Sequence, residues 1–225
     1  MKNIISIILF IFILPSAQAK FNIDLGFGLK SKSLTGVDKL TQVEGKLVGN
    51  ALMQTRFNIL WGLSQKWQLL IDYASTTVDF DNSDNVITGP DSVTLSKTAI
   101  GARWIIMPRA AFRFYYSMEQ DVAFGLNGSS PPQAVLYTET INHIDLWYDQ
   151  IVFMGGSMYS GFRVGYGLGA SGAKTIDRSG TDIALFFVWD NWDFSYEFTN
   201  FTKSNSELDF VEKDTTIGVK YSLKF

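Results

Sequence analysis

His143 is the only histidine in the chain and therefore the first candidate for acid–base chemistry near neutral pH. It lies in the segment ETINHIDLWYD (139–149), with Glu139 four residues before it and Asp145 two residues after it. If this segment is a β-strand, all three side chains point to one face, and the carboxylates could support His143 as a general base. We favour a structural role instead, with His143 as one member of a network of buried charges.

A glycine-rich segment, GYGLGASGAK (165–174), places Gly167, Gly169 and Gly172 in the G-x-G-x-x-G spacing of dinucleotide-binding loops. No helical pattern follows these glycines, although a dinucleotide site needs a helix there. We therefore expect a structural role for the glycines of this region, which would line the inside of the fold opposite bulky side chains. These glycines are Gly161, Gly165, Gly167 and Gly169.

Three acidic residues close to one another, Asp81, Asp84 and Asp91, offer the oxygen ligands that Ca²⁺ prefers. Their spacing matches no known calcium-loop motif, so a solvated acidic loop is the better interpretation. The sequence thus predicts no catalytic residue, no metal site and no cofactor.

The first 19 residues have the organisation of a secretory signal peptide, with a basic start at Lys2, an apolar run over 4–14 and small residues before the expected cleavage point. The remaining residues, 20–225, are long enough for one domain with a large core. The chain has no Cys, which excludes disulfides and thiolate chemistry. It has no basic block of the kind that nucleic-acid binding requires.

Beyond residue 19, segments of about ten alternating apolar and polar residues recur, as is typical of transmembrane β-barrels. The sequence predicts an all-β fold, a closed antiparallel up-and-down barrel of about ten strands, with eight or twelve as alternatives. Polar connections alternate with short ones, which indicates loops at one end of the barrel and tight turns at the other; residues 149–156 fit neither class. The expected strands are 21–31, 47–61, 67–79, 95–106, 111–120, 135–147, 157–169, 181–189, 192–201 and 214–225.

All six tryptophans fall at strand ends beside the short connections. Tryptophan concentrates at the interface between membrane and water, because its ring is apolar and its N–H is polar. Phe21 and Phe225 lie at the same level of the expected barrel. The sequence therefore predicts a membrane-interface girdle made of Trp61, Trp67, Trp104, Trp147, Trp189, Trp192 and Phe225.

The last eight residues, GVKYSLKF (218–225), resemble the C-terminal β-signal of Gram-negative outer-membrane β-barrel proteins, with Gly218, Tyr221, Leu223 and a terminal Phe225. The resemblance covers the last strand only. It implies that the barrel-insertion machinery recognises this strand, and that the protein resides in the outer membrane with both termini in the periplasm. Outer-membrane lipid and lipopolysaccharide would then be its partners, whereas the sequence does not identify a ligand for the loops.

The two faces of the expected strands differ in charge. One face carries aromatic and aliphatic residues, and the other carries eight acids and eight bases, which in a narrow lumen we expect to fill the space as ion pairs. A soluble, lipocalin-like barrel with the two faces exchanged is the alternative. Asn142 falls on the expected lipid face, for which we expect a bulge or an oligomer contact. The expected lumen network is Arg56, Asp72, Arg103, Arg113, Glu119, Glu139, His143, Asp145, Arg163, Glu197 and Lys220.

The favoured function is that of a structural or surface-interaction barrel without enzyme activity, whose exposed loops are 33–46, 81–93, 121–134 and 202–213. A narrow porin-like channel for small solutes is the alternative. An enzyme that modifies lipid A or resembles the omptin proteases is a weaker one. Outer-membrane lipid hydrolases carry a nucleophilic Ser where this chain has Asp145, and omptins place their catalytic carboxylates at the extracellular rim, whereas we expect His143 nearer the periplasm.

Overall fold

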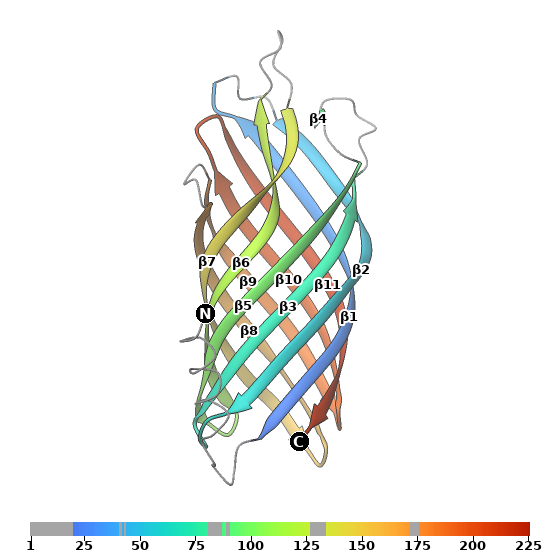
Figure 1. Ribbon diagram of the computed structural model, residues 1–225, viewed down its shortest axis with the longest axis vertical. Coiled ribbons are helices and arrows are strands. Elements are labelled where there is room, and N and C mark those ends of the chain that lie inside the picture. The colour runs from blue at the N-terminus through green and yellow to red at the C-terminus, as the bar shows by residue number, and fades with distance from the viewer. Residues whose placement is uncertain are drawn as a thin grey trace, which may run out of the picture.

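Ten long antiparallel strands form a closed barrel (Figure 1). The computed structural model describes residues 20–40, 42, 44–80, 87–88, 91–126, 134–171 and 176–225. The predicted signal peptide over residues 1–19 lies outside these ranges. The long strands are β1 (Phe21–Asp38), β2 (Glu44–Gly62), β3 (Trp67–Asp79), β5 (Ser92–Met107), β6 (Ala110–Leu126), β7 (Ala134–Gly155), β8 (Met158–Ser171), β9 (Asp177–Trp189), β10 (Trp192–Ser204) and β11 (Leu208–Lys224).

Each long strand pairs with its neighbours in the chain, and one further pairing, between the first and last strands, closes the sheet. β1 pairs with β11, where the backbone N–H groups of Phe21 and Phe225 each donate to the other residue's carbonyl, at 3.3 and 2.9 Å. The short strand β4 (Ile87–Thr88) adds a parallel pairing at the start of β7. The prediction of a closed up-and-down barrel of about ten strands is therefore confirmed. No helix among the described residues is long and apolar enough to cross a membrane.

The two ends of the barrel differ, as the sequence predicts. We call the end with the connections 63–66, 108–109, 156–157 and 190–191 the turn end; the first residue of β1 and the last of β11 also lie there. We call the other end, with the connections 39–43, 80–91, 127–133, 172–176 and 205–207, the loop end. In Figure 1 the turn end is at the bottom and the loop end is at the top.

Several strands are longer than the sequence analysis predicts, mostly at the loop end. Residues 33–38, 121–126, 202–204 and 208–213, which were expected in exposed loops, belong to strands. The apolar stretch 149–155 continues β7, with a bulge between Ile151 and Phe153, and a tight turn follows at Gly156, whose φ is 60°. The predicted loops are too long because polar residues on the outward face of the continuing strands, such as Ser33, Thr35 and Thr202, resemble a turn signal.

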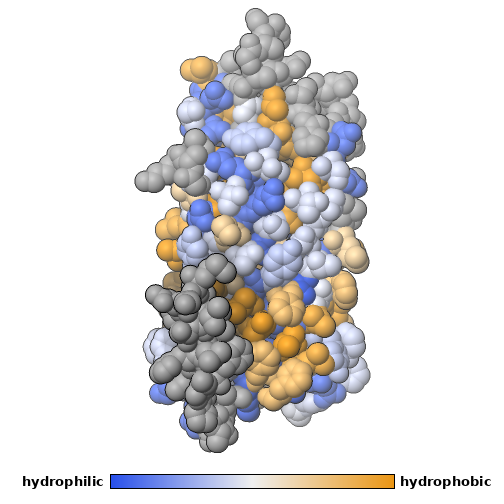
Figure 2. All heavy atoms as spheres, in the orientation of Figure 1, coloured by the Kyte–Doolittle hydropathy of each residue, from blue (hydrophilic) through white to orange (hydrophobic). Residues whose placement is uncertain are grey.

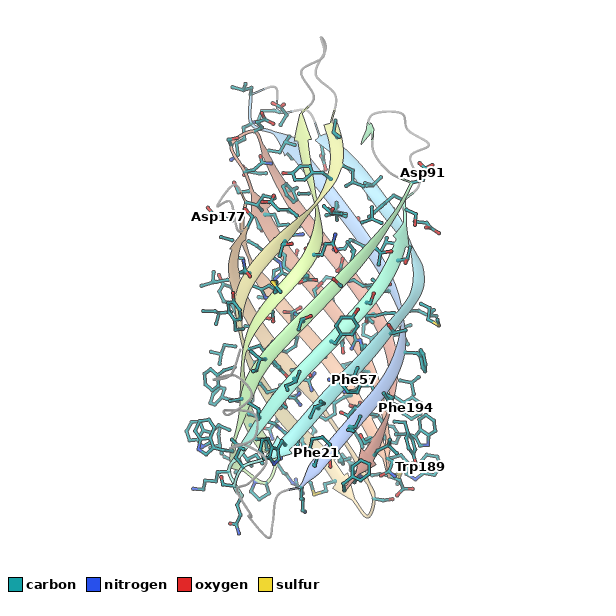
Figure 3. The ribbon with its side chains drawn as sticks, in the orientation of Figure 1. Phe21, Phe57, Asp91, Asp177, Trp189 and Phe194 are labelled. Atoms are coloured by element: carbon teal, nitrogen blue, oxygen red, sulfur yellow. The ribbon has the colours of Figure 1, made fainter. Side chains whose placement is uncertain are left out.

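The outer surface changes character along the barrel axis. In the half near the turn end, the outward side chains are apolar and exposed, and we call this zone the apolar belt; it ends toward the loop end at Leu29, Met53, Tyr73, Ile100, Ile144, Leu168, Ile183, Phe198 and Ile217. Figure 3 shows Trp189 and Phe194 within this half, and Asp91 and Asp177 nearer the loop end. Figure 2 shows apolar residues gathered over the turn-end half of one face, below more polar residues.

Past the belt, the same outward positions carry mainly hydroxyl and amide side chains. On β1, Leu29 is followed by Ser31, Ser33 and Thr35, and the other strands change in the same way. Their polar outward residues include Ser75, Thr77, Thr94, Thr98, Thr138, Thr140, Thr181, Asn200, Thr202 and Lys213. The Thr77 and Thr94 hydroxyls lie 3.1 Å apart, a cross-strand pair suited to a wet surface.

The interior changes in the opposite sense. In the loop-end half, inward side chains from most strands form a hydrophobic core, which we call the apolar plug: Leu34, Leu47, Val78, Phe80, Val93, Leu95, Val122, Ala123, Leu136, Ile141, Ile176, Leu208 and Phe210. In the turn-end half the interior is charged. At the turn end, apolar side chains face outward and charged ones face inward, as in a membrane barrel. At the loop end, polar side chains face outward over an apolar core, as in a soluble barrel. The predicted membrane barrel and its lipocalin-like alternative therefore each describe one half.

Candidate functional site

The interior of the barrel is the candidate site, because charged side chains converge there from nearly every strand. The first layer below the apolar plug is a group of fully buried charges, which we call the loop-end ion cluster. Lys32 Nζ lies 2.6 Å from Glu212, 3.0 Å from Asp121 and 3.3 Å from Asp214. Lys203 contacts both Asp121 and Glu212. The side chains of Lys32 and Lys203 have no exposed surface.

The strand register explains why these charges meet. Lys32 is directly opposite Asp214 in the pairing of β1 with β11, and Glu212 is two residues before Asp214 on the same face. Lys203 comes from the adjoining β10, whereas Asp121 comes from β6 on the far side of the barrel. The cluster therefore joins opposite walls across the lumen. Buried charges of this kind are stable only when all of them are paired.

His143 belongs to the next layer, near the middle of β7. Its Nδ1 lies 2.8 Å from Asp145 and its Nε2 lies 3.2 Å from Glu119. The ring is 1% exposed. Ser117 donates its hydroxyl to Asp145 at 3.2 Å and not to His143, so this arrangement differs from a nucleophile–base pair. The expectation that His143 lies nearer the turn end is wrong, because it is the tenth residue of a strand that runs from Ala134 to Gly155.

Two further cations complete this layer. Lys97 Nζ lies 3.5 Å from Asp145, and Arg178 Nη2 lies 3.3 Å from Glu119. The Arg178 guanidinium carbon lies 3.6 Å from the centre of the Phe201 ring, which covers one of its faces. This layer borders an internal cavity of about 180 Å³, which Arg56 and Glu197 also line; these two side chains are joined by two hydrogen bonds of 2.7 Å.

The layer nearest the turn end is an arginine cluster. Arg113 Nε donates to Asp149 at 2.5 Å and Arg163 Nε donates to its other oxygen at 2.7 Å. Arg103 Nε is 3.6 Å from Asp149, too far for a hydrogen bond. The Arg163 guanidinium carbon also lies 5.5 Å from the Trp147 ring centre. The three arginines and Asp149 line a second cavity of about 330 Å³, which reaches the turns at 108–109 and 190–191.

The structure places almost all of the predicted lumen residues inside the barrel. Arg56, Arg103, Arg113, Glu119, His143, Asp145, Arg163, Glu197 and Lys220 are each within 4.0 Å of an oppositely charged or potentially charged partner. Asp72 lines both cavities. Glu139 is half-buried near the loop-end part of β7.

Seven interior residues of these layers are absent from the predicted lumen network. Most lie in segments predicted to be connections, and Asp149 lies in the stretch 149–156, which fits neither class of connection. The period-2 alternation continues through them, for example from Leu208 through Phe210 and Glu212 to Asp214, and this was the available signal. The missed residues are Lys32, Asp121, Asp149, Arg178, Lys203, Glu212 and Asp214.

The aromatic girdle is largely where the sequence places it. Trp67 and Trp104 stack with ring centres 6.0 Å apart, and Trp192 meets Tyr221 of the C-terminal motif edge-on at 4.8 Å. Phe225 is 73% exposed at the turn end. The prediction is wrong for Trp147, which points inward and packs beside Leu70, Ala99 and Tyr115. Trp147 lies on the same inward face of β7 as His143 and Asp145, because the three are alternate residues of one strand. The strand alternation therefore outweighs the preference of tryptophan for the membrane interface.

Two smaller predictions have different outcomes. The glycines of β8 do face bulky inward side chains: Gly165, Gly167 and Gly169 lie opposite Trp147, Asp145 and His143 in the register. No bulge accommodates Asn142, since its strand is regular at that point. Instead, the Tyr116 hydroxyl donates to its side-chain oxygen at 3.1 Å on the outer face.

The candidate metal and nucleotide segments lie only partly within the described residues. Among them, no group of three or more His, Asp or Glu side chains is placed to hold a metal ion. Asp81, Asp84 and Gly172 lie outside the described residues, as do parts of the expected loops 33–46, 81–93 and 121–134.

No protein-family model matches the chain, and no curated protein matches it in sequence. Among solved structures, it is similar to the outer-membrane protease OmpT from Escherichia coli, with 10% identity, a TM-score of 0.46, and 91% of this chain and 97% of that chain covered. It is also similar to an outer-membrane channel from Pseudomonas putida F1, with 8% identity, a TM-score of 0.49, and 93% and 97% covered. For the attachment invasion locus protein Ail of Yersinia pestis, the identity is 7%, the TM-score 0.38, and the coverage 91% and 99%.

Proposed function

We propose that the protein is an integral outer-membrane β-barrel with a closed lumen, which acts as a structural or surface-interaction protein. One observation carries the proposal: the loop-end half of the lumen is filled by the apolar plug and, beneath it, by the loop-end ion cluster. A solute passing through the barrel would have to displace both layers.

The apolar belt supports the membrane location. On β8 the belt runs from Met158 to Leu168, ten residue steps, which is about 33 Å along the strand and about 25 Å along the barrel axis at a tilt of about 40°. This matches the height of the lipid-facing band of outer-membrane barrels, about 25 Å. The Trp side chains at the turn end mark one edge of the band.

The polar outer face of the loop-end half supports a protruding domain. A surface of Ser and Thr hydroxyls is unsuited to hydrocarbon, so this half extends beyond the bilayer. We assign the turn end to the periplasm and the loop end to the cell exterior, because short periplasmic turns and longer outer loops are the rule in this class. The protruding half is then available to lipopolysaccharide, other cells or partner proteins.

The decisive experiment is a conductance measurement on purified protein in planar bilayers. We expect no stable unitary current steps from the wild-type chain. Reconstitution must be verified in the same membranes by heat-modifiable migration on SDS gels, so that an absence of current reflects a closed lumen and not a bilayer without protein. Stable unitary steps would refute the closed lumen and support the narrow porin-like channel instead.

A further inference from the structure

The cavity of about 330 Å³ at the turn end has the dimensions of a small-ligand site. Its wall on one side comes from four adjacent strands, β5 to β8, which contribute Arg103, Arg113, Asp149 and Arg163. Three guanidinium groups thus share one carboxylate. This wall carries two positive charges more than negative ones when all four groups are ionised.

Arg103 is the least satisfied of the three arginines. Its Nη1 donates to Gln68 at 3.2 Å, but its Nε is buried and has no hydrogen-bond partner. A buried donor without an acceptor is costly. The Arg103 side chain as a whole is 24% exposed and lines the cavity, so its other guanidinium N–H groups are available to an incoming oxygen ligand. Arg113 and Arg163 already donate to Asp149, which holds the cluster in place before any ligand arrives.

The remaining charges of the cavity neutralise this wall only in part. Asp193 on β10 pairs with Lys220 at 2.9 Å, and Asp24 on β1 accepts the Ser222 hydroxyl at 2.7 Å; these strands form the opposite side of the barrel. Asp72 on β3 lies next to the arginine wall. In all, six Arg and Lys and five Asp side chains line the cavity, so it is weakly positive overall and strongly positive at the wall.

We propose that the turn-end cavity binds a small anion, which places a carboxylate or phosphate group on the wall formed by Arg103, Arg113 and Arg163. Planar guanidinium groups suit both oxyanions, because two parallel N–H donors can meet two oxygens. The ligand enters from the turn end, since the cavity is bounded there by the turns 108–109 and 190–191 and the plug closes the other end.

The test is titration calorimetry on refolded full-length barrel in detergent, with inorganic phosphate, succinate and the uncharged succinamide as probes at constant chloride concentration. We expect saturable one-to-one binding of at least one of the two anions and none of succinamide. Binding of phosphate alone would indicate a phosphate-bearing ligand, and binding of succinate alone a carboxylate ligand. If neither anion binds saturably up to about 10 mM, the proposal is wrong.

Arg103→Gln should weaken the binding about tenfold or more, because it removes one charged donor from the wall. Lys39→Gln is the matched control: it changes the net charge equally, but Lys39 lies on the exposed loop end beside Asp209. Equal affinity of Arg103→Gln and wild type, or equal weakening by the control, would overturn the proposal. If Arg103→Gln fails to fold, Arg103→Lys takes its place. We expect it to bind the anion several-fold more weakly, because an ammonium group lacks the planar pair of N–H donors of a guanidinium.

Discussion

Gly165 on β8 lies directly opposite Trp147 on β7, and the Trp147 ring fills the space that a side chain at position 165 would occupy. A Cβ atom there would come within 2.6 Å of the Trp147 ring. The inward turn of this tryptophan therefore depends on a glycine in the neighbouring strand. Trp147 in turn provides the aromatic face next to Arg163 of the arginine cluster.

Gly165→Ala should destabilise the barrel by about 1–3 kcal/mol, because overpacking forces the Trp147 ring or the backbone to move. Urea unfolding in lipid vesicles, followed by heat-modifiable migration, measures the change. Gly62→Ala is the matched control, since the nearest heavy atom to its Cβ would be at an ordinary 3.4 Å. A Gly165→Ala barrel as stable as the control would contradict the packing described above.

Lys203→Met should cost about 3–5 kcal/mol of unfolding free energy, because it leaves Asp121 and Glu212 buried with one cation fewer. Adding Glu212→Gln should recover part of the loss, since the double variant restores the charge balance. Lys39→Met provides the comparison at the surface, where the pair with Asp209 at 3.2 Å is largely solvated and worth less than about 1 kcal/mol. Similar losses for the two lysines would show that the loop-end ion cluster is not closed to water.

Tyr116→Phe should destabilise the barrel by about 0.6 kcal/mol, because it removes the hydrogen bond to Asn142 on the outer face at the loop-end edge of the apolar belt. Asn142→Leu alone should be neutral or stabilising, as an apolar side chain then meets lipid. In the double variant, Tyr116→Phe should cost nothing further. A double-mutant cycle in vesicles gives the coupling, and a coupling of zero would place Asn142 in contact with something other than Tyr116.

The border between the apolar belt and the polar outer face can be located by labelling, because the natural chain contains no Cys. Thr35→Cys and Thr140→Cys should react with a membrane-impermeant maleimide in intact cells, since both lie on the protruding half. Leu29→Cys and Ile144→Cys, three and two outward positions closer to the turn end than Thr35 and Thr140, should be protected by lipid. Labelling in the reverse pattern would invert the proposed orientation, and uniform labelling would exclude membrane insertion.

The fold was predictable because the signal that specifies it is local. Alternation identifies strands, and the lengths of the connections separate the two ends, so the barrel and its approximate strand number follow from the sequence. The same holds for most of the charges in the turn-end half, such as Arg56 and Glu197, which share the inward parity on their strands. Their pairing across the lumen was expected in kind, although the individual partners depend on register.

The loop-end half was not predictable in the same way. There many outward residues are Ser, Thr and Asn, which resemble loop residues in sequence. The inward residues of the apolar plug are apolar, opposite to the rule that applies in the other half. Lys203 therefore falls in the predicted loop 202–213, and Lys32 falls just beyond the predicted strand 21–31. Asp149 was missed because Ile151, Val152 and Phe153 after it belong to a bulged continuation of β7, whose irregular register hides the alternation.

The reversal of polarity along the barrel affects how strongly the inserted protein resists extraction from the bilayer. Once the apolar plug has assembled outside the membrane, pulling the barrel back would drag hydroxyl-covered strands into hydrocarbon while the core that they enclose stays intact. The protruding half, folded after insertion, would thus oppose withdrawal of the barrel from the membrane. In the proposed orientation, resistance to extraction depends on how well that core is packed.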